Sequence, residues 1–343
     1  MGEEDMDILI LGGTGNISRQ IVKQGIALGH NVTMVNRGSR VLEECMGAKA
    51  IVADRKASGF ASLFKGMKFD VVIDVICYDV PDARQTLEIF SDKAKQIIFT
   101  SSSAVYKRPP ISFPIDEDRE ELTEDPSFPY GFKKANMERY LYTQMGKVGC
   151  AITIIRPSLT FGPGGANLGM LRQNRNLVRR IKEGRPVVTL GEGVMPWAFT
   201  FTPDLAKGYL MACLNERTYN DFFQVCSYMP CLWEDLYRAI GKAVGREPRL
   251  CYIPTDVLYK VDPSLFGHLS VEKKYFHVFA VDKFRRACPG FKIDYDLQKG
   301  VEMMIGWWEE SDFPFDDSKD RLEDRLCEAY DRFSESMSRV NGD

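Results

Sequence analysis

The chain has 343 residues, a formal net charge of -3 at pH 7 and 44% hydrophobic residues. That length suits two domains, or one large domain with an appended lobe. The near-neutral charge gives no electrostatic case for binding nucleic acid or a membrane surface. No apolar run approaches the roughly 20 residues that a membrane span needs. The acidic start of the chain is unlike a signal peptide, and the nine cysteines form no CxxC pair, so we expect a cytoplasmic protein with reduced thiols and no metal site.

Strand and helix patterns alternate over the first half of the chain. The apolar run 8–11, followed by glycine, is typical of a buried parallel strand, and the spacing over 16–28 predicts a helix. Five more apolar runs predict strands at 32–35, 50–53, 71–76, 96–101 and 152–155. This alternation predicts an α/β fold: a doubly wound parallel sheet of the Rossmann type, with helices on both faces.

The pattern changes after Arg156, where loop signals replace the alternation. We therefore predict a dinucleotide-binding domain over 1–160 and a smaller, discontinuous C-terminal substrate lobe over most of 161–310, with some segments returning to the sheet. The remaining residues, 311–343, are predicted to form an acidic helical tail.

Finer patterns appear within the lobe and the tail. Residues 171–183 predict a basic helix and 186–190 a strand, whereas 227–291 looks irregular and rich in aromatic residues and proline. Apolar residues recur at helical spacing along the tail and predict a narrow stripe that packs on its own domain. These are Leu322, Leu326, Tyr330, Phe333 and Met337.

A glycine-rich turn joins the first strand to the first helix. Gly12 and Gly15 allow the backbone to turn sharply and to approach a pyrophosphate. Asn16 and Ile17 then open the helix, whose free amides and positive dipole end attract phosphate. Because the turn lies within a strand-loop-helix unit, it predicts a dinucleotide site.

The end of the second strand bears on the choice of cofactor. An acid there would bind the ribose hydroxyls of NAD. The chain has Asn36 and Arg37 instead, and an arginine can pair with the extra phosphate of NADP. We expect NAD or NADP and favour NADP, although Arg37 would alternatively be solvated or stacked on the adenine. Asp54, after the third strand, would accept a hydrogen bond from the adenine amino group or simply cap its loop.

A tyrosine and a lysine lie one helical turn apart at Tyr130 and Lys134. Residues with this spacing share one helix face. The ammonium of Lys134 favours the phenolate of Tyr130 and so lowers the pKa of that phenol. A tyrosine of this kind can exchange a proton with a substrate hydroxyl.

Taken together, these motifs resemble the extended short-chain dehydrogenase/reductase family, in particular its NAD-dependent epimerase/dehydratase branch. The resemblance covers nearly all of residues 7–309 and includes the Ser-Ser-Ser-Ala-Val-Tyr run at 101–106. It implies that Tyr130 is the general base and that Lys134 binds the nicotinamide ribose. It also implies that Ser102 hydrogen-bonds the substrate oxygen, although Ser102 would otherwise cap a turn.

The chain departs from family patterns at the substrate positions. The acid pair of the 4,6-dehydratases is replaced by Ser103 and Ala104, which argues against dehydration chemistry. An arginine that binds the diphosphate in many nucleotide-sugar enzymes is replaced by Trp197. Arg172 and the arginines that follow it would supply charge instead, unless they form a solvated helix face. Ser103, Trp197 and Arg172 are the expected substrate contacts.

The resemblance implies NAD(P)-dependent oxidoreduction at a sugar-like secondary alcohol, most simply by a nucleotide-sugar epimerase or a related enzyme. One alternative is an NADP-dependent ketoreductase or dehydrogenase whose substrate has no nucleotide. Another is an RNA-binding or cofactor-sensing protein of the same fold, against which the net charge and the Tyr130–Lys134 pair both argue. The expected partners are a small-molecule substrate and a second copy of the chain, with neither nucleic acid nor membrane. The resemblance implies a homodimer formed through the helix of Tyr130 and the helix before it.

Overall fold

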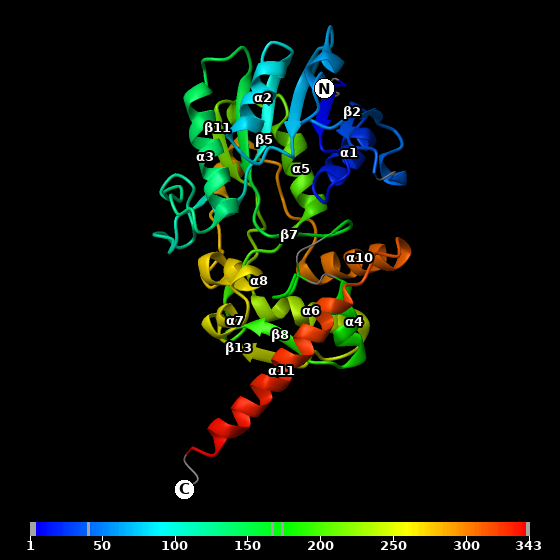
Figure 1. The fold of residues 1–343 in the computed structure, drawn as a ribbon. Helices are drawn as coiled ribbons and strands as arrows, with labels where there is room; N and C mark the ends of the chain where they lie inside the picture. Colours follow the sequence, from blue (N-terminus) through cyan, green and yellow to red (C-terminus); the bar gives the residue numbers. More distant parts are fainter. Residues whose placement is uncertain (1–4, 40–41, 166–167, 173–174, 341–343) are drawn as a thin grey trace. The chain divides into compact units, whose positions relative to one another are not determined.

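The computed structural model describes residues 5–39, 42–165, 168–172 and 175–340, and it consists of two compact units (Figure 1). Unit 1 contains Met1–Ser158, Thr202–Tyr228 and Phe279–Asp294. Unit 2 contains Leu159–Phe201, Met229–Val278 and Tyr295–Asp343. Both units are therefore built from segments that are far apart in the sequence.

Unit 1 is built on a parallel sheet of seven strands in the order β11-β6-β5-β4-β1-β2-β3, which confirms the predicted doubly wound Rossmann fold. The strands are β1 (Asp7–Leu11), β2 (Asn31–Asn36), β3 (Lys49–Val52), β4 (Phe69–Asp74), β5 (Ala94–Thr100), β6 (Ala151–Arg156) and β11 (Asp221–Gln224). Six of them match the predicted strands within two residues at each end, whereas β11 was not predicted. The chain reverses direction across the sheet between β1 and β4, the place where ligands bind in such folds.

Helices cover both faces of this sheet. On one face, α1 (Ser18–Ala27) and α5 (Thr202–Ala212) pack against alternate strand residues such as Ile8 and Ile10. On the other, α2 (Val80–Phe90) and α3 (Pro129–Gln144) pack against the intervening residues, such as Leu9. The central strands are therefore buried on both sides, which explains their continuous apolar runs. One further helix of unit 1, α9 (Asp282–Ala287), packs beside β11.

Unit 2 is mainly helical and has a single hydrophobic core that includes Trp197, Trp233 and Trp308. Its helices are α4 (Arg175–Glu183), α6 (Trp233–Val244), α7 (Thr255–Val261), α8 (Pro263–His268), α10 (Leu297–Glu310) and α11 (Asp317–Ser338). Its strands are short and pair two by two: β8 (Val187–Leu190) with β13 (Leu250–Ile253), β7 (Thr160–Phe161) with β10 (Thr200–Phe201), and β9 (Pro196–Trp197) with β12 (Cys231–Leu232).

The expectation that 227–291 is irregular was wrong, because α6, α7, α8 and α9 all lie within it. The prolines here do not interrupt helices. Pro263 occupies the first turn of α8, where its missing N–H has no intrahelical partner anyway, and Asp262 caps the same helix by accepting from Leu265 N at 2.9 Å. Counting proline as a loop signal therefore hid these helices.

The acidic tail forms α11, and its first half packs on unit 2. Leu326 is buried, and Leu322 and Tyr330 pack against the same core. The predicted apolar stripe continues beyond this contact, but Phe333 and Met337 are more than half exposed. Packing on its own domain therefore accounts for the N-terminal half of the stripe.

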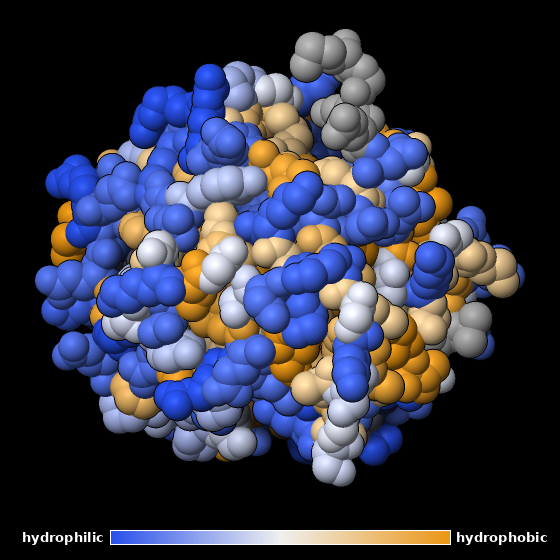
Figure 2. All heavy atoms as spheres, turned by 90° about the horizontal axis from the view of Figure 1, so that it is seen from above, coloured by the Kyte–Doolittle hydropathy of each residue, from blue (hydrophilic) through white to orange (hydrophobic). Residues whose placement is uncertain are grey.

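The surface of the described residues is mixed in polarity. Figure 2 shows hydrophilic side chains over most of the face that it presents, with hydrophobic side chains between them. Isolated exposed apolar residues such as Leu28 and Met46 are ordinary at protein surfaces. None of the helices in the described part of the chain combines the length and the apolar character needed to cross a membrane.

Candidate functional site

The glycine turn after β1 is held by a hydroxyl. Gly12 has φ +97°, and a Cβ there would lie 2.5 Å from Cγ2 of Ile76, so only glycine fits. Ser18, at the start of α1, donates to Gly12 O at 2.5 Å and accepts from Gly15 N at 2.9 Å. Asn16 and Ile17 lead directly into α1. The bare backbone beside a helix N-terminus suits the pyrophosphate of a dinucleotide.

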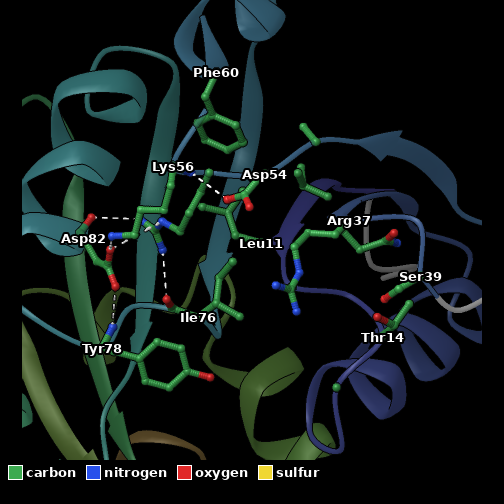
Figure 3. Close-up of a pocket in the computed structure, with 16 residues that line it drawn as sticks. Leu11, Thr14, Arg37, Ser39, Asp54, Lys56, Phe60, Ile76, Tyr78 and Asp82 are labelled. Carbon is green, nitrogen blue, oxygen red and sulfur yellow. Dashed lines mark hydrogen bonds and ion pairs between the residues drawn. The ribbon is translucent and has the colours of Figure 1, made fainter. Parts of the chain in front are cut away.

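A pocket with a volume of about 490 Å³ lies next to this turn (Figure 3). Its lining includes five residues that the sequence predicted as cofactor contacts, namely Gly12, Gly15, Asn36, Arg37 and Asp54. It also includes polar residues that the sequence analysis missed, among them Thr14, Ser39, Arg55, Lys56, Tyr78 and Asp82. Most of these missed residues lie just after the carboxyl ends of β1 to β4, and that position was the signal that could have found them.

Arg37 is exposed and its guanidinium extends into the pocket in Figure 3. Asn36 accepts from Gly38 N at 2.7 Å and so shapes the turn that carries Arg37. Asp54 accepts from Lys56 N at 2.8 Å, which makes it a loop cap that also lines the pocket. The pocket wall after β2 therefore presents a cation where a carboxylate would favour NAD.

The loops after β3 and β4 are joined by Arg55, which is buried. Its guanidinium donates to both carboxylate oxygens of Asp74 at 3.1 Å, to Ile76 O at 3.0 Å and to Asp82 O at 2.8 Å. These bonds satisfy a charge that would be costly to bury alone. Arg55 thus fixes the relative positions of two loops that line the pocket.

Lys134 lies on α3 and is almost fully buried. Its ammonium donates to Cys77 O at 2.6 Å and to Thr100 O at 2.7 Å, at the ends of two neighbouring strands. Burial lowers the pKa of Lys134. The ring of Tyr78, which lines the pocket, has its centroid 5.1 Å from the same ammonium, so Lys134 adjoins the pocket.

Tyr130 lies in the first turn of α3 and is 45% exposed. A Cβ at Gly131 would lie 2.4 Å from Ala104 O, so glycine lets this turn approach the loop after β5 closely. Burial raises the pKa of Tyr78, while the Lys134 ammonium opposes the rise and the phenol of Tyr130 adds to it. Tyr130 and Lys134 are four residues apart on α3 and therefore share one face of the helix.

The serine run after β5 has three different environments. Ser102 is partly exposed and accepts from Ala104 N at 3.2 Å, so it caps the short turn Ser103–Val105, as the alternative explanation expected. Ser103 is buried, and its N–H donates to Pro157 O at 2.9 Å. Ser101 is also buried and donates to Glu138. Among the three, Ser102 is the one whose side chain is open to solvent.

A buried ion pair lies behind the Tyr130 turn. Glu138 on α3 accepts from Nε of Arg156, at the end of β6, at 3.0 and 3.1 Å. Tyr142 donates to the same carboxylate at 2.5 Å, and Ser101 donates to it as well. The pair therefore ties α3 to β6 and to the loop that carries Ser102.

Two of the expected substrate contacts, Trp197 and Arg172, lie in unit 2. Trp197 is 1% exposed and stacks on His277 with a centroid distance of 3.7 Å. Arg172 is exposed, and its φ of +56° is not a helical angle. The helix α4 begins at Arg175, and not at residue 171 as expected. The arginines of α4 form ion pairs with acids of α11 and of the segment before it. Arg179 lies 3.0 Å from Asp320, and Arg180 lies 3.1 Å from Glu323. They form neither a solvated face nor an open anion site.

The described residues hold no group of three or more His, Cys, Asp or Glu side chains suited to a metal ion.

The sheet order, the glycine turn and the Tyr130–Lys134 pair define a Rossmann-fold protein of the extended short-chain dehydrogenase/reductase class. The family model described as "NAD dependent epimerase/dehydratase family" matches residues 8–225. The chain belongs to this family, which confirms the resemblance drawn from its motifs.

The proteins to which the chain is similar carry different names. The chain is 22% identical over 292 residues to 2'-dehydrokanamycin reductase of Streptomyces kanamyceticus, covering 84% of this chain and 81% of the relative. It is 27% identical over 318 residues to the chloroplast stem-loop binding protein of 41 kDa b of Arabidopsis thaliana, covering 86% and 77%. Among solved structures, the epimerase Mth375 of Methanothermobacter thermautotrophicus superposes with a TM-score of 0.74 at 16% identity, covering 90% and 93%.

Proposed function

We propose that the protein catalyses NAD(P)-dependent hydride transfer at a secondary alcohol of a sugar-like substrate. The observation that carries the proposal is the position of Tyr130 and Lys134: one helical turn apart on α3, with Lys134 adjoining the pocket that contains the glycine turn. A cofactor bound at the turn supplies the hydride acceptor or donor.

The chain's own groups handle the proton. Tyr130, exposed in the first turn of α3, takes the proton from the substrate hydroxyl or returns it to the ketone. The ammonium of Lys134 stabilises the phenolate and binds the nicotinamide ribose. Ser102, whose side chain is partly open, holds the substrate oxygen.

NADP is the cofactor that we favour, because Arg37 extends into the pocket from the end of β2, the position at which an acid would favour NAD. Replacing Arg37 with Ala removes a charged partner of the extra phosphate, worth about 1.5–3 kcal/mol. The Kd for NADP should rise roughly 10- to 150-fold, while that for NAD changes little. Fluorescence titration of both cofactors measures this, with Arg119→Ala, an exposed arginine outside the pocket lining, as the control. An equal loss for both cofactors would refute phosphate recognition by Arg37.

Two reaction outcomes use the same residues. The sequence favoured nucleotide-sugar epimerisation, in which the ketone is reduced again from its other face, and one relative is named UDP-glucuronate 4-epimerase. A net ketoreductase is favoured by Arg37 and by the relative named a reductase. The cofactor that copurifies separates them: retained NAD supports the epimerase, and freely exchanging NADP supports the reductase.

An RNA-binding role is the third candidate, because one relative is named a stem-loop binding protein. The net charge of -3 and the buried Lys134 beside the pocket argue against it here. Filter binding with a stem-loop RNA over a salt series tests it, since phosphate contacts would give a steep salt dependence. RNA retention at physiological salt would favour this candidate over the enzyme.

We expect a homodimer formed through α3 and α2. Tyr140 is partly exposed on α3 and has Arg84 of α2 above its ring at 5.5 Å, so both helices contribute to this face. Light scattering at micromolar concentration should give about twice the 39.0 kDa of one chain. Tyr140→Asp should then dissociate the dimer, whereas Tyr142 is a poor choice because it supports Glu138. A mass near that of one chain would refute the dimer.

A further inference from the structure

Two of the three cysteines of unit 2 are buried on elements that pack against each other. Cys251 lies on β13 and Cys327 on α11, and both belong to the single hydrophobic core of this unit. In Figure 1, α11 runs across β8 and β13, and it contacts both strands. The third cysteine, Cys231 on β12, is less buried, and all three are free thiols.

A hydrogen bond between α11 and β8 brings the two buried cysteines to the same place. The N–H of Val188 donates to Glu323 of α11 at 2.7 Å, and Val188 is the direct neighbour of Cys251 in the β8–β13 pair. Glu323 and Cys327 are four residues apart on α11, so they share one helix face, and both are buried. Neighbouring strands lie about 4.8 Å apart and one helical turn rises about 5.4 Å, so the two cysteines are offset from the Val188–Glu323 contact by similar distances.

The two thiols also interact with each other, as this geometry implies. A side-chain hydrogen bond from Cys327 lowers the pKa of the Cys251 thiol, and the same bond raises the pKa of Cys327. The S–H of Cys327 therefore donates to the sulfur of Cys251, which is the thiol that ionises more readily. The thiolate is the form of cysteine that attacks a disulfide. A disulfide between two residues requires that their side chains point toward each other, and this pair meets that requirement.

The C-terminal half of α11 gives access to this buried pair. Beyond Cys327 the helix carries Phe333 and Met337, which are more than half exposed, so little buried apolar surface holds this half in place. Segments with few buried contacts open locally at a lower cost than global unfolding. The N-terminal half is held by ion pairs with α4, such as Arg179 with Asp320. Opening therefore begins in the C-terminal half and reaches Cys327 before it reaches those ion pairs.

We propose that Cys251 and Cys327 form a reversible disulfide that fastens α11 to β13 when a low-molecular-weight disulfide is present. The Cys251 thiolate attacks one sulfur of the small disulfide, whose other half leaves as a thiolate and takes up the proton that Cys251 lost. Cys327 then loses its proton and attacks the Cys251 sulfur of the mixed disulfide, and the second half leaves as a thiol. Two protein thiols are thereby oxidised to one disulfide, and one small disulfide is reduced to two thiols. This modification site lies within unit 2 and does not depend on the proposed hydride transfer.

Incubation of the full, folded chain with oxidised glutathione tests the proposal. After the reaction is stopped with acid, alkylation in denaturant and peptide mapping without reduction identify the linked residues. We expect one pair of peptides joined through Cys251 and Cys327, in a chain about 2 Da lighter because two hydrogens are lost. Cys327→Ser should abolish the link. Cys231→Ser, the same change at the less buried cysteine of unit 2, should leave it intact.

Thermal unfolding measures whether the link fastens the helix. The oxidised wild type should have a midpoint roughly 4–16 °C above that of the reduced protein, dithiothreitol should reverse the rise, and Cys327→Ser should show none. The proposal is overturned if the folded chain yields only glutathione adducts, a link through Cys231, or a link that forms only in denaturant. A Cys251–Cys327 link that leaves the midpoint unchanged would equally overturn it, because the disulfide would then fasten nothing.

Discussion

Replacing Tyr130 with Phe is expected to lower turnover by roughly 10²–10⁴-fold, the range that general acid–base groups typically contribute. The phenyl ring keeps the packing of the first turn of α3 and removes only the hydroxyl. Cofactor affinity should remain nearly unchanged, because the glycine turn and Arg37 line the proposed cofactor pocket, whereas Tyr130 does not. Steady-state rates on a sugar-like alcohol or ketone, together with a cofactor titration, measure both quantities.

Tyr78→Phe is the matched control for this experiment. Its ring packs against the Lys134 ammonium at a centroid distance of 5.1 Å, so the substitution keeps this ring and removes only its hydroxyl. We expect Tyr78→Phe to retain most of the activity. A Tyr130→Phe enzyme within about twofold of the wild type, far short of the expected range, would refute the catalytic assignment. Equal losses in both variants would point to a general effect of the phenols on the pocket.

Replacing Glu138 with Gln is expected to lower the free energy of unfolding by about 3–5 kcal/mol, because it leaves the guanidinium of Arg156 buried without a counter-charge. Both side chains are buried, and two neighbouring hydroxyls donate to the carboxylate. Urea denaturation followed by circular dichroism measures the loss. The conformation of the loop that carries Ser102 should also change, since the neighbouring Ser101 donates a hydrogen bond to the carboxylate that is replaced.

Glu124→Gln provides the comparison. Glu124 is 89% exposed and lies 3.9 Å from Arg139, and an exposed pair of this kind contributes about 0–1 kcal/mol. The two substitutions make the same chemical change at buried and exposed sites. If Glu138→Gln cost no more than Glu124→Gln, the ion pair would not be what ties α3 to β6.

The sequence by itself was sufficient for the features that depend on neighbouring residues. The strand-glycine-helix unit around Gly12 and the helical spacing of Tyr130 and Lys134 are local patterns, and both led to the correct fold and family. The alternation of apolar runs predicted six strands of the sheet for the same reason: a strand buried on both faces must be apolar throughout.

Only the tertiary structure decided how charges are paired. Arg55 meets Asp74, Arg156 meets Glu138, and Arg180 meets Glu323 across separations from 18 to 143 residues. No periodicity encodes such contacts, because each depends on where the fold brings two distant segments together. The burial of Lys134 on two carbonyl oxygens was hidden for the same reason.

The same limit applies to Lys273. In the sequence it is one of two adjacent lysines, Lys273 and Lys274, with nothing to distinguish them. The fold buries the first beside Trp233 and leaves the second exposed. Burial removes water from one ammonium and not from its neighbour, and this difference in solvation lowers the pKa of Lys273 to about 8.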